Sequence, residues 1–176
     1  RSHPGQRIYY YRRLASEPEP LVSEHIVFQD EWLVVADKPH FMPVTPSGRF
    51  VQQSLLVRLK RRLGLADLSP VHRIDRETAG LVVFAVQTHT RDAYQALFRE
   101  RKIDKRYEAI APALPHLDFP VQRTTRLVAS EPFFRMQEGP GASNTETAVE
   151  VREKNGDLWR YGLYPVTGKK HQLRVH

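Results

Sequence analysis

The sequence predicts an α+β protein in which helices flank a mainly antiparallel or mixed central sheet. Strand-like segments follow one another along the chain, and helices are inserted at irregular intervals, unlike the regular strand–helix alternation of a parallel sheet. In addition, Asn155-Gly156 separates two alternating segments, residues 145–152 and 158–164, as in a tight antiparallel hairpin. Both observations favour antiparallel pairing of sequence neighbours.

The first half of the chain contains the following expected elements. Residues 7–11 form a short aromatic strand candidate and residues 16–20 a linker rich in Pro and Glu. Residues 25–28 and 32–36 are two strands around a turn, followed by a rigid loop that contains Pro39, Pro43, Pro46 and Gly48. Residues 51–63 are a helix, because its leucines recur at helical spacing with basic residues on the other side.

The second half continues the mixture of strands and helices. An irregular stretch from Pro70 leads into a buried strand, residues 81–86, and residues 88–102 form an amphipathic helix with Thr88 or Thr90 as its N-cap. Residues 106–111 are another strand. Residues 112–142 are polar and contain prolines, so we expect a long excursion with short strands.

The composition fits a globular enzyme. The 176 residues are 40% hydrophobic and 10% aromatic, enough to bury a substantial core. The chain has no cysteine, which excludes disulfides, thiolate metal sites and a cysteine nucleophile and fits a reducing compartment. Apolar runs such as residues 81–86 are too short to span a bilayer. We therefore expect a cytoplasmic protein that does not act on a membrane.

The charge distribution points to an anionic partner. Lys and Arg number 27 against 20 Asp and Glu, a net charge of +7. The basic residues gather in four groups: Arg58, Lys60, Arg61 and Arg62; Arg99, Arg101, Lys102, Lys105 and Arg106; Arg123 and Arg126; and Lys169, Lys170 and Arg174. Separate basic groups suit a surface that follows a phosphate backbone. The alternative is a set of solvated helix faces, above all for the first group.

The richest stretch of potential chemistry is His-Arg-Ile-Asp-Arg-Glu-Thr-Ala-Gly, residues 72–80, which runs directly into the apolar strand. A loop carried by a rigid strand is a common place for a reactive group. Asp75 lies between Arg73 and Arg76, and positive neighbours favour its ionised form. Asp75 could therefore act as a nucleophile or base, or it could belong to a surface network of Arg and Asp.

Two further stretches carry polar side chains. In residues 165–176, a phosphate-binding loop at Thr167-Gly168-Lys169 fails on spacing, since Gly162 is one residue too distant and Lys170 stands where Ser or Thr is needed. A metal site of His72, His171 and His176 lacks an acidic ligand with matching spacing. As a strand, this stretch would place Gln172, Arg174 and His176 on one face, leaving Arg174 available to a carboxylate. Tyr107 is either a half-buried sheet aromatic or a flat surface for a base.

In their order along the chain, these stretches resemble the RluA family of pseudouridine synthases. The match covers residues 24–176 and rests on four motifs: the strand–turn–strand segment ending in Lys38-Pro39, residues 72–80, Lys105-Arg106-Tyr107, and residues 167–176. Lys169, Ile74 and Ala79 replace the family's usual Arg, Leu and Ser. We expect an N-terminal extension, residues 1–24, and a catalytic domain, residues 25–176, that lacks the C-terminal continuation that in this family completes the sheet.

The resemblance implies isomerisation of uridine to pseudouridine within ribosomal or transfer RNA. Asp75 would be the nucleophile, Arg174 its partner and Tyr107 a stacking residue, while Arg73 would fill the space of a flipped base. The RNA-binding residues implied are His72, Arg73, Leu173, Lys169, His171, Arg61, Arg62, Lys102 and Lys105. No cofactor or metal is expected, because the reaction is neither redox nor hydrolytic. We expect a monomer without an obligate protein partner.

Two alternatives stay open. The chain could be a catalytically inactive RNA-binding module of the same fold, although the set of Asp75, Tyr107 and Arg174 is intact. It could also be a glycoside or nucleoside hydrolase that uses Asp75. Such enzymes need a second positioned carboxylate, and neither Glu77 nor Glu108 follows a recognisable acid pattern.

Overall fold

The computed structural model describes residues 16–132 and 134–176. The strand candidate at residues 7–11 lies outside the described residues. The chain divides into two compact units, Arg1–Ala96 and Leu97–His176. The expected α+β class is confirmed, with its strands divided between the units, and every strand pairing among the described residues is antiparallel. The predicted division at residue 24 stays a prediction.

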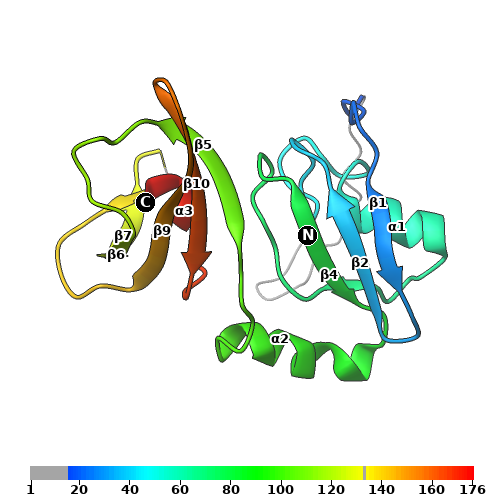
Figure 1. Ribbon diagram of the computed structural model, residues 1–176. Coiled ribbons are helices and arrows are strands. Elements are labelled where there is room, and N and C mark those ends of the chain that lie inside the picture. Colours follow the sequence, from blue (N-terminus) through cyan, green and yellow to red (C-terminus); the bar gives the residue numbers. More distant parts are fainter. Residues whose placement is uncertain (1–15, 133) are drawn as a thin grey trace, which may run out of the picture. The chain divides into compact units, whose positions relative to one another are not determined.

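The first unit contains a four-stranded sheet in the order β1-β2-β4-β3 (Figure 1). Its strands are β1 (His25–Gln29), β2 (Leu33–Lys38), β3 (Ser69–Pro70) and β4 (Gly80–Ala85). The predicted turn between the first two strands is closed by the Asp30 carboxylate, which accepts hydrogen bonds from the amides of Trp32 and Leu33 at 2.8 and 2.7 Å. The short strand β3 was not predicted.

Helix α1 (Leu55–Leu63) packs its leucines into the core of the first unit. Leu55 and Leu59 are fully buried against a cluster that includes Val34 and Phe84 of the sheet. The helix ends at Gly64, whose φ of +69° suits a glycine. It begins four residues later than the predicted start at residue 51, because the amides of residues 51–53 bind the Glu17 carboxylate instead of continuing a helix.

The second predicted helix is shorter than expected. A 3₁₀ turn (Thr88–Thr90) precedes α2 (Arg91–Arg99). Thr90 directly precedes α2, and its hydroxyl donates to the carbonyl of Gln87 at 3.1 Å. The capping role of Thr88 or Thr90 stays a prediction. The helix stops before residue 102, since Arg101 takes a left-handed conformation with φ of +58°.

The second unit is built on a four-stranded sheet in the order β5-β10-β9-β6. Its strands are β5 (Tyr107–Pro112), β6 (Val121–Thr125), β9 (Thr145–Asn155) and β10 (Leu158–Pro165). The predicted hairpin is confirmed, with the two-residue loop Gly156-Asp157 one position later than expected. The predicted excursion contains β6 and a small two-stranded sheet of β7 (Leu127–Ser130) and β8 (Arg135–Glu138).

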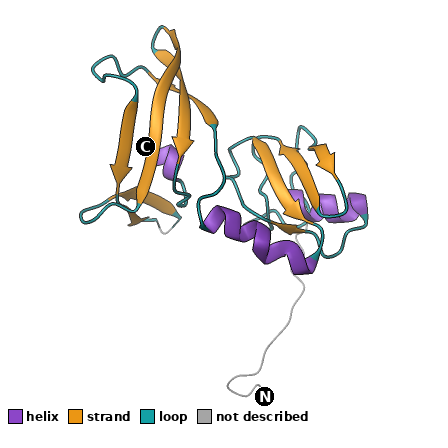
Figure 2. Ribbon diagram, turned by 60° about the horizontal axis from the view of Figure 1, so that its bottom comes forward, coloured by secondary structure: helices purple, strands orange, loops and turns teal. Residues whose placement is uncertain are grey.

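One face of the second sheet is apolar at one end and polar at the other. Val149, Tyr161 and Leu163 form the apolar part, and Thr145 and Thr147 of β9 continue the same face. The short helix α3 (Gln172–Val175) lies against this sheet (Figure 2). Residues 172–175 are therefore helical, and the strand interpretation of this stretch is wrong. Among the described residues, no helix is long and apolar enough to cross a membrane.

Candidate active site

The predicted reactive loop, residues 72–80, connects β3 to β4 in the first unit and is anchored at both ends. His72 Nε2 accepts a hydrogen bond from the Val83 amide of β4 at 3.1 Å, so this ring nitrogen carries no proton. The amide of Thr78 donates to the carbonyl of Asp75 at 3.1 Å and closes a turn. At the far end, Gly80 has a φ of +123°, which favours glycine. Asp75 is half-buried within this turn.

Lys38 is buried beneath this loop and was not assigned a role from the sequence. Its side chain is 0% exposed, and its ammonium donates to the carbonyls of Met42 at 2.7 Å, Pro39 at 3.0 Å and Arg76 at 3.1 Å. One ammonium group thus ties the residue after Asp75 to the proline-containing segment that follows β2. A buried ammonium needs such partners, because burial without them is costly.

The charge of Lys38 is coupled to the loop carboxylates. Burial lowers the pKa of Lys38 to about 8, while the nearby Glu77 and Asp75 carboxylates act in the opposite direction. Below pH 8 the ammonium therefore carries a positive charge close to the Asp75 and Glu77 carboxylates. A carboxylate held ionised can serve as a nucleophile or base.

A second contact fixes the loop from the same segment. His40 Nδ1 donates to the carbonyl of Glu77 at 2.5 Å, and the Glu77 carboxylate pairs with Arg76 at 2.9 Å. The carbonyls of both residues that follow Asp75 are thus held by side chains from residues 38–40. The backbone on this side of Asp75 is fixed before any ligand binds.

In the second unit, Tyr107 begins β5 and lies beside the core. It is half-buried, is paired with Leu163 of β10 and packs against the cluster that also receives Leu173 of α3. Two residues predicted to contact substrate, Tyr107 and Leu173, are therefore placed on the same apolar cluster. Each keeps part of its side chain exposed.

Lys105 has a structural contact that the sequence did not reveal. Its ammonium donates to the carbonyl of Thr167 at 3.0 Å and to that of Val166 at 3.4 Å, and burial together with Arg101 lowers its pKa. Lys105 thus connects the start of β5 to the loop after β10. A cavity of about 320 Å³ lies beside it, lined by Arg101, Ile103, Asp104, Lys105, Arg106, Tyr164, Pro165 and Val166.

The loop after β10 is held to the sheet by the buried side chain of Gln172. The Gln172 amide oxygen accepts from the Thr167 hydroxyl at 2.8 Å and the Lys169 amide at 3.0 Å. Its amide nitrogen donates to the Glu146 carbonyl at 3.1 Å and the Thr147 hydroxyl at 2.9 Å. All the hydrogen-bonding capacity of this amide is used, so the loop has one defined position relative to β9.

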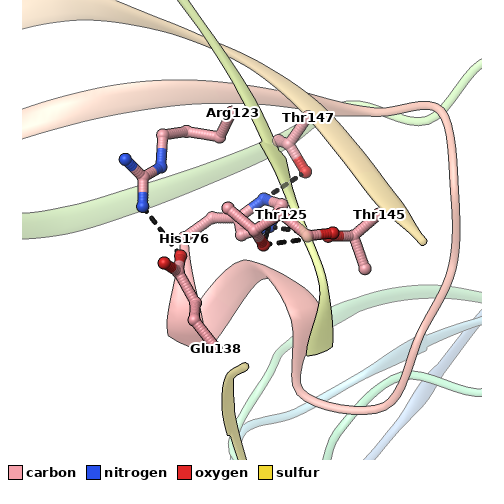
Figure 3. Close-up of polar contacts among 6 residues, drawn as sticks. All are labelled: Arg123, Thr125, Glu138, Thr145, Thr147 and His176. Atoms are coloured by element: carbon pink, nitrogen blue, oxygen red, sulfur yellow. Dashed lines mark hydrogen bonds and ion pairs between the residues drawn. The ribbon is translucent and has the colours of Figure 1, made fainter. Parts of the chain in front are cut away.

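The helical turn changes which side chains of this stretch share a face. Gln172 and His176 are one turn apart and both bond to Thr147 of the sheet (Figure 3 shows the contact of His176), whereas Arg174 between them is exposed. The expectation that Arg174 would share a face with Gln172 and His176 is therefore wrong. His171 before the helix has a φ of +55°, a conformation that is uncommon among residues other than glycine.

The predicted site residues fall into two groups by unit. Asp75, His72, Arg73, Arg61 and Arg62 belong to the first unit, and Tyr107, Arg174, Leu173, Lys169, His171, Lys102 and Lys105 belong to the second. Arg73, Arg61, Arg62, Lys102 and Lys169 are exposed, as binding to RNA would require. Within the described residues, no group of three or more His, Asp or Glu side chains is arranged to hold a metal ion.

The alternation of residues along β2 could have identified Lys38 as a buried residue from the sequence alone. Val34, Ala36 and Lys38 alternate along β2, and all three are fully buried. Strand periodicity alone would have placed Lys38 on the core face, where a lysine must have a specific role. No comparable pattern marked Gln172, because its partners lie in other elements.

Known proteins resemble this chain over most of its length. The RNA pseudouridylate synthase family model matches residues 32–176. The chain is 29% identical over 174 residues to human pseudouridylate synthase RPUSD2, covering 95% of this chain and 31% of that protein. It is 29% identical over 156 residues to the mitochondrial tRNA pseudouridine(32) synthase of Saccharomyces cerevisiae, covering 86% of this chain and 33% of that protein.

A solved structure has the same fold. The human RNA pseudouridylate synthase domain containing 4 superimposes with a TM-score of 0.69 at 29% identity, over 86% of this chain and 62% of that one. The chain thus spans about a third of the length of the two curated relatives. The family match includes Asp75, Tyr107 and Arg174. The chain belongs to the RNA pseudouridylate synthase family, of the RluA type.

Proposed function

We propose that the protein is an RNA pseudouridine synthase that isomerises uridines within ribosomal or transfer RNA, with Asp75 as its nucleophile. Family membership supports the reaction. The observation that carries the role of Asp75 is the buried ammonium of Lys38, which fixes the Arg76 carbonyl beside it and places a positive charge close to the carboxylate. A fixed and ionised carboxylate on a loop has the properties that nucleophilic catalysis requires.

The reaction exchanges one glycosidic bond for another without changing the composition of the RNA. The bond from the sugar to N1 of uracil breaks, a bond from the same carbon to C5 forms, and the C5 proton is lost while N1 gains one. Asp75 could attack the sugar, attack the base or remove a sugar proton, and each route needs its ionised form. Arg174 is proposed to pair with Asp75, and Tyr107 to stack on the uracil and help remove the C5 proton.

The target base must leave its stack before any of these steps. Flipping costs a few kcal/mol, and the vacated space is commonly filled by a side chain. Arg73 is exposed two residues before Asp75, which supports its proposed role of filling that space. The exposed Lys169 and the half-buried His72, His171 and Leu173 are proposed to contact the RNA around the flipped nucleotide.

The substrate is proposed at the level of RNA class. The name of the yeast relative specifies transfer RNA, and ribosomal RNA is the other class expected for the RluA type. Mapping pseudouridines in both RNA classes from cells lacking the protein, and again after its restoration, identifies the substrate. A monomeric enzyme acting in the cytoplasm remains our prediction, and fractionation of the cells would test the location.

The decisive experiment replaces Asp75 by Asn. We expect Asp75→Asn to abolish pseudouridine formation, because the amide is a poor nucleophile and base, while RNA affinity changes little. Asp67→Asn is the matched control, since Asp67 is an exposed aspartate of the same unit. Turnover by Asp75→Asn at the normal rate would remove Asp75 from its role.

The same assay separates the alternatives. A catalytically inactive RNA-binding module would bind RNA without releasing tritium from uracil labelled at C5. A hydrolase would release free uracil and leave an abasic site. We expect tritium release in proportion to pseudouridine formed and no free uracil.

A further inference from the structure

Phe41 lies in the segment between β2 and α1, with its ring exposed and its backbone strained. Its side chain is 65% exposed, and its φ is +65°. A positive φ is uncommon for any residue other than glycine and is an outlier for one with a bulky side chain. Such strain persists only where the surrounding structure enforces it, and it gathers at functional sites. A rigid environment must therefore hold Phe41 in this conformation.

The residues on both sides of Phe41 provide that environment. His40 Nδ1 donates to the carbonyl of Glu77 at 2.5 Å, and the Lys38 ammonium donates to the carbonyl of Met42 at 2.7 Å. Met42 is 1% exposed and belongs to the core of the first unit. The chain is thus tied to the reactive loop before Phe41 and to the core after it. The strained residue cannot relax without breaking these contacts.

The ring of Phe41 is the one exposed apolar side chain in residues 38–45. The other apolar residues of this segment are buried or half-buried: Pro39, Met42, Pro43 and Val44. The nearest ring is that of His40 in the preceding position, with the two centroids 6.0 Å apart. A protein partner would require a contiguous apolar area, whereas a nucleic-acid base needs only one flat ring. The setting therefore favours a base as the group that covers Phe41.

Phe41 also lies next to the residue that contacts the reactive loop. His40 holds the carbonyl of Glu77, two residues after Asp75. The same loop carries Arg73, whose exposed guanidinium can bind a phosphate. All of these residues belong to the first unit. The ring is thus displayed beside the loop to which the target nucleotide would bind.

We propose that Phe41 is a stacking platform for an unpaired RNA base next to the target uridine. This inference rests on the proposed function, which brings RNA to the loop of Asp75. Flipping a uridine exposes the faces of the neighbouring bases, and unstacked bases are commonly bound by stacking on aromatic side chains. The fixed backbone holds the ring in its binding position before RNA arrives, so little conformational entropy is lost on binding.

The first test measures the affinity of the complete protein for a single-stranded oligouridylate of about ten nucleotides by fluorescence anisotropy, because stacking tolerates any base sequence. Phe41→Ala should weaken binding by about fivefold to a hundredfold, the range for one base stacked on one aromatic side chain. Phe41→Trp should retain the affinity, because indole offers a larger flat surface. Equal affinities of the Ala and Trp variants, or no binding by the wild type, would overturn the proposal.

Phe28→Ala is the matched control for the loss of an exposed phenyl ring. Phe28 is 49% exposed on β1 of the same unit and pairs with Val35 of β2, away from the end of β2 that meets the reactive loop. The Phe28 variant should bind the oligouridylate as tightly as the wild type. A loss of affinity as large as that of Phe41→Ala would show that the effect is not specific to Phe41 and would contradict the proposal.

The salt dependence of binding separates stacking from charge. Stacking releases no counterions, so Phe41→Ala should weaken binding by the same factor at each salt concentration and leave the slope of log K against log salt unchanged. A shallower slope for Phe41→Ala would show that the variant has lost phosphate contacts instead of a stacked base.

Phe41→Gly distinguishes a binding role from a structural one. Glycine adopts a φ of +65° without strain, and the ring that it removes is largely exposed. The midpoint of denaturant unfolding should therefore equal or exceed that of the wild type, while RNA affinity falls as it does in Phe41→Ala. A lower midpoint with unchanged affinity would show that the ring supports the fold, and this result would overturn the proposal.

These binding measurements do not depend on the reaction. If the wild type forms pseudouridine and Phe41→Ala binds RNA equally well, the stacking role fails and the proposed function stands. If the wild type forms no pseudouridine but loses affinity when the ring is removed, the proposed reaction fails and the stacking role stands.

Discussion

Two lysines in this protein hold loops in place by donating hydrogen bonds to backbone carbonyls, and Lys38 is the clearer case. Its ammonium is fully buried and bonds to three carbonyls, one of which belongs to Arg76, next to the proposed nucleophile. Lys105 does the same in the second unit, for the loop after β10. Both lysines occur in the motifs that identify the family. Their contacts make them parts of the scaffold that orients the site.

Replacing Lys38 by Met should therefore destabilise the protein and loosen the reactive loop. The variant leaves buried carbonyls without a donor, which costs about 1–3 kcal/mol of unfolding free energy. We expect kcat to fall while KM for RNA changes little, because the loss affects the position of Asp75. Denaturant unfolding and steady-state kinetics measure both effects. Lys60→Met on α1 is the control for stability, and equal losses in the two variants would contradict this role.

The pH dependence of stability gives an independent check on Lys38. Its pKa in the folded protein is about 8, below the ordinary value of 10.5, so between these values the unfolded chain binds the proton more tightly. The contribution of this group to unfolding free energy therefore rises with pH across that window. Below pH 8 the full cost of burying the charge is present. The difference in unfolding free energy between wild type and Lys38→Met should shift in favour of the wild type from pH 8 to pH 10.

At the scale of elements, the sequence located the strands and helices but missed boundaries that depend on distant partners. The hairpin of β9 and β10 was predictable because its turn and its alternation are local. The start of α1 was not, since the amides of residues 51–53 bind a carboxylate 34–36 residues earlier in the chain. The α3 stretch alternates like a strand, yet Gln172 and His176 satisfy their hydrogen bonds only as a helical turn against β9.

The Glu17 contact is testable at the same scale. Desolvation opposes ionisation of Glu17, but the amides of Gln52, Gln53 and Val51, helped by Arg61, prevail and lower its pKa. A lowered carboxyl pKa adds stability that is present above the ordinary value of 4.5 and is lost as pH falls through the folded value. Glu17→Gln should therefore cost about 0.5–1.5 kcal/mol at pH 7 and progressively less as the pH falls below 4.5. Glu19→Gln, exposed nearby, should have no such effect.

At the scale of the whole molecule, the positive charge is carried by both units. Arg61 and Arg62 extend from α1 in the first unit, and Lys102 follows α2 in the second. Their partners are Gln52 for Arg61, the Glu24 carbonyl for Arg62 and Glu100 for Lys102. Such exposed contacts contribute little to the stability of the protein, so a phosphate group of the RNA can replace them. Lys105 is different, because its ammonium already holds two carbonyls.

Replacing Arg61, Arg62 and Lys102 together by Gln should weaken RNA binding and reduce its salt dependence. Each lost phosphate contact lowers the slope of log K against log salt by about 0.7 for single-stranded RNA, so the triple variant should lose roughly two units. The control replaces Arg152, Lys154 and Arg160, which removes the same charge from exposed positions on β9 and β10. If both triples reduce the slope equally, the total charge of the protein determines binding. A selective effect of the first triple would show that contacts of these side chains with the RNA, rather than total charge, determine the slope.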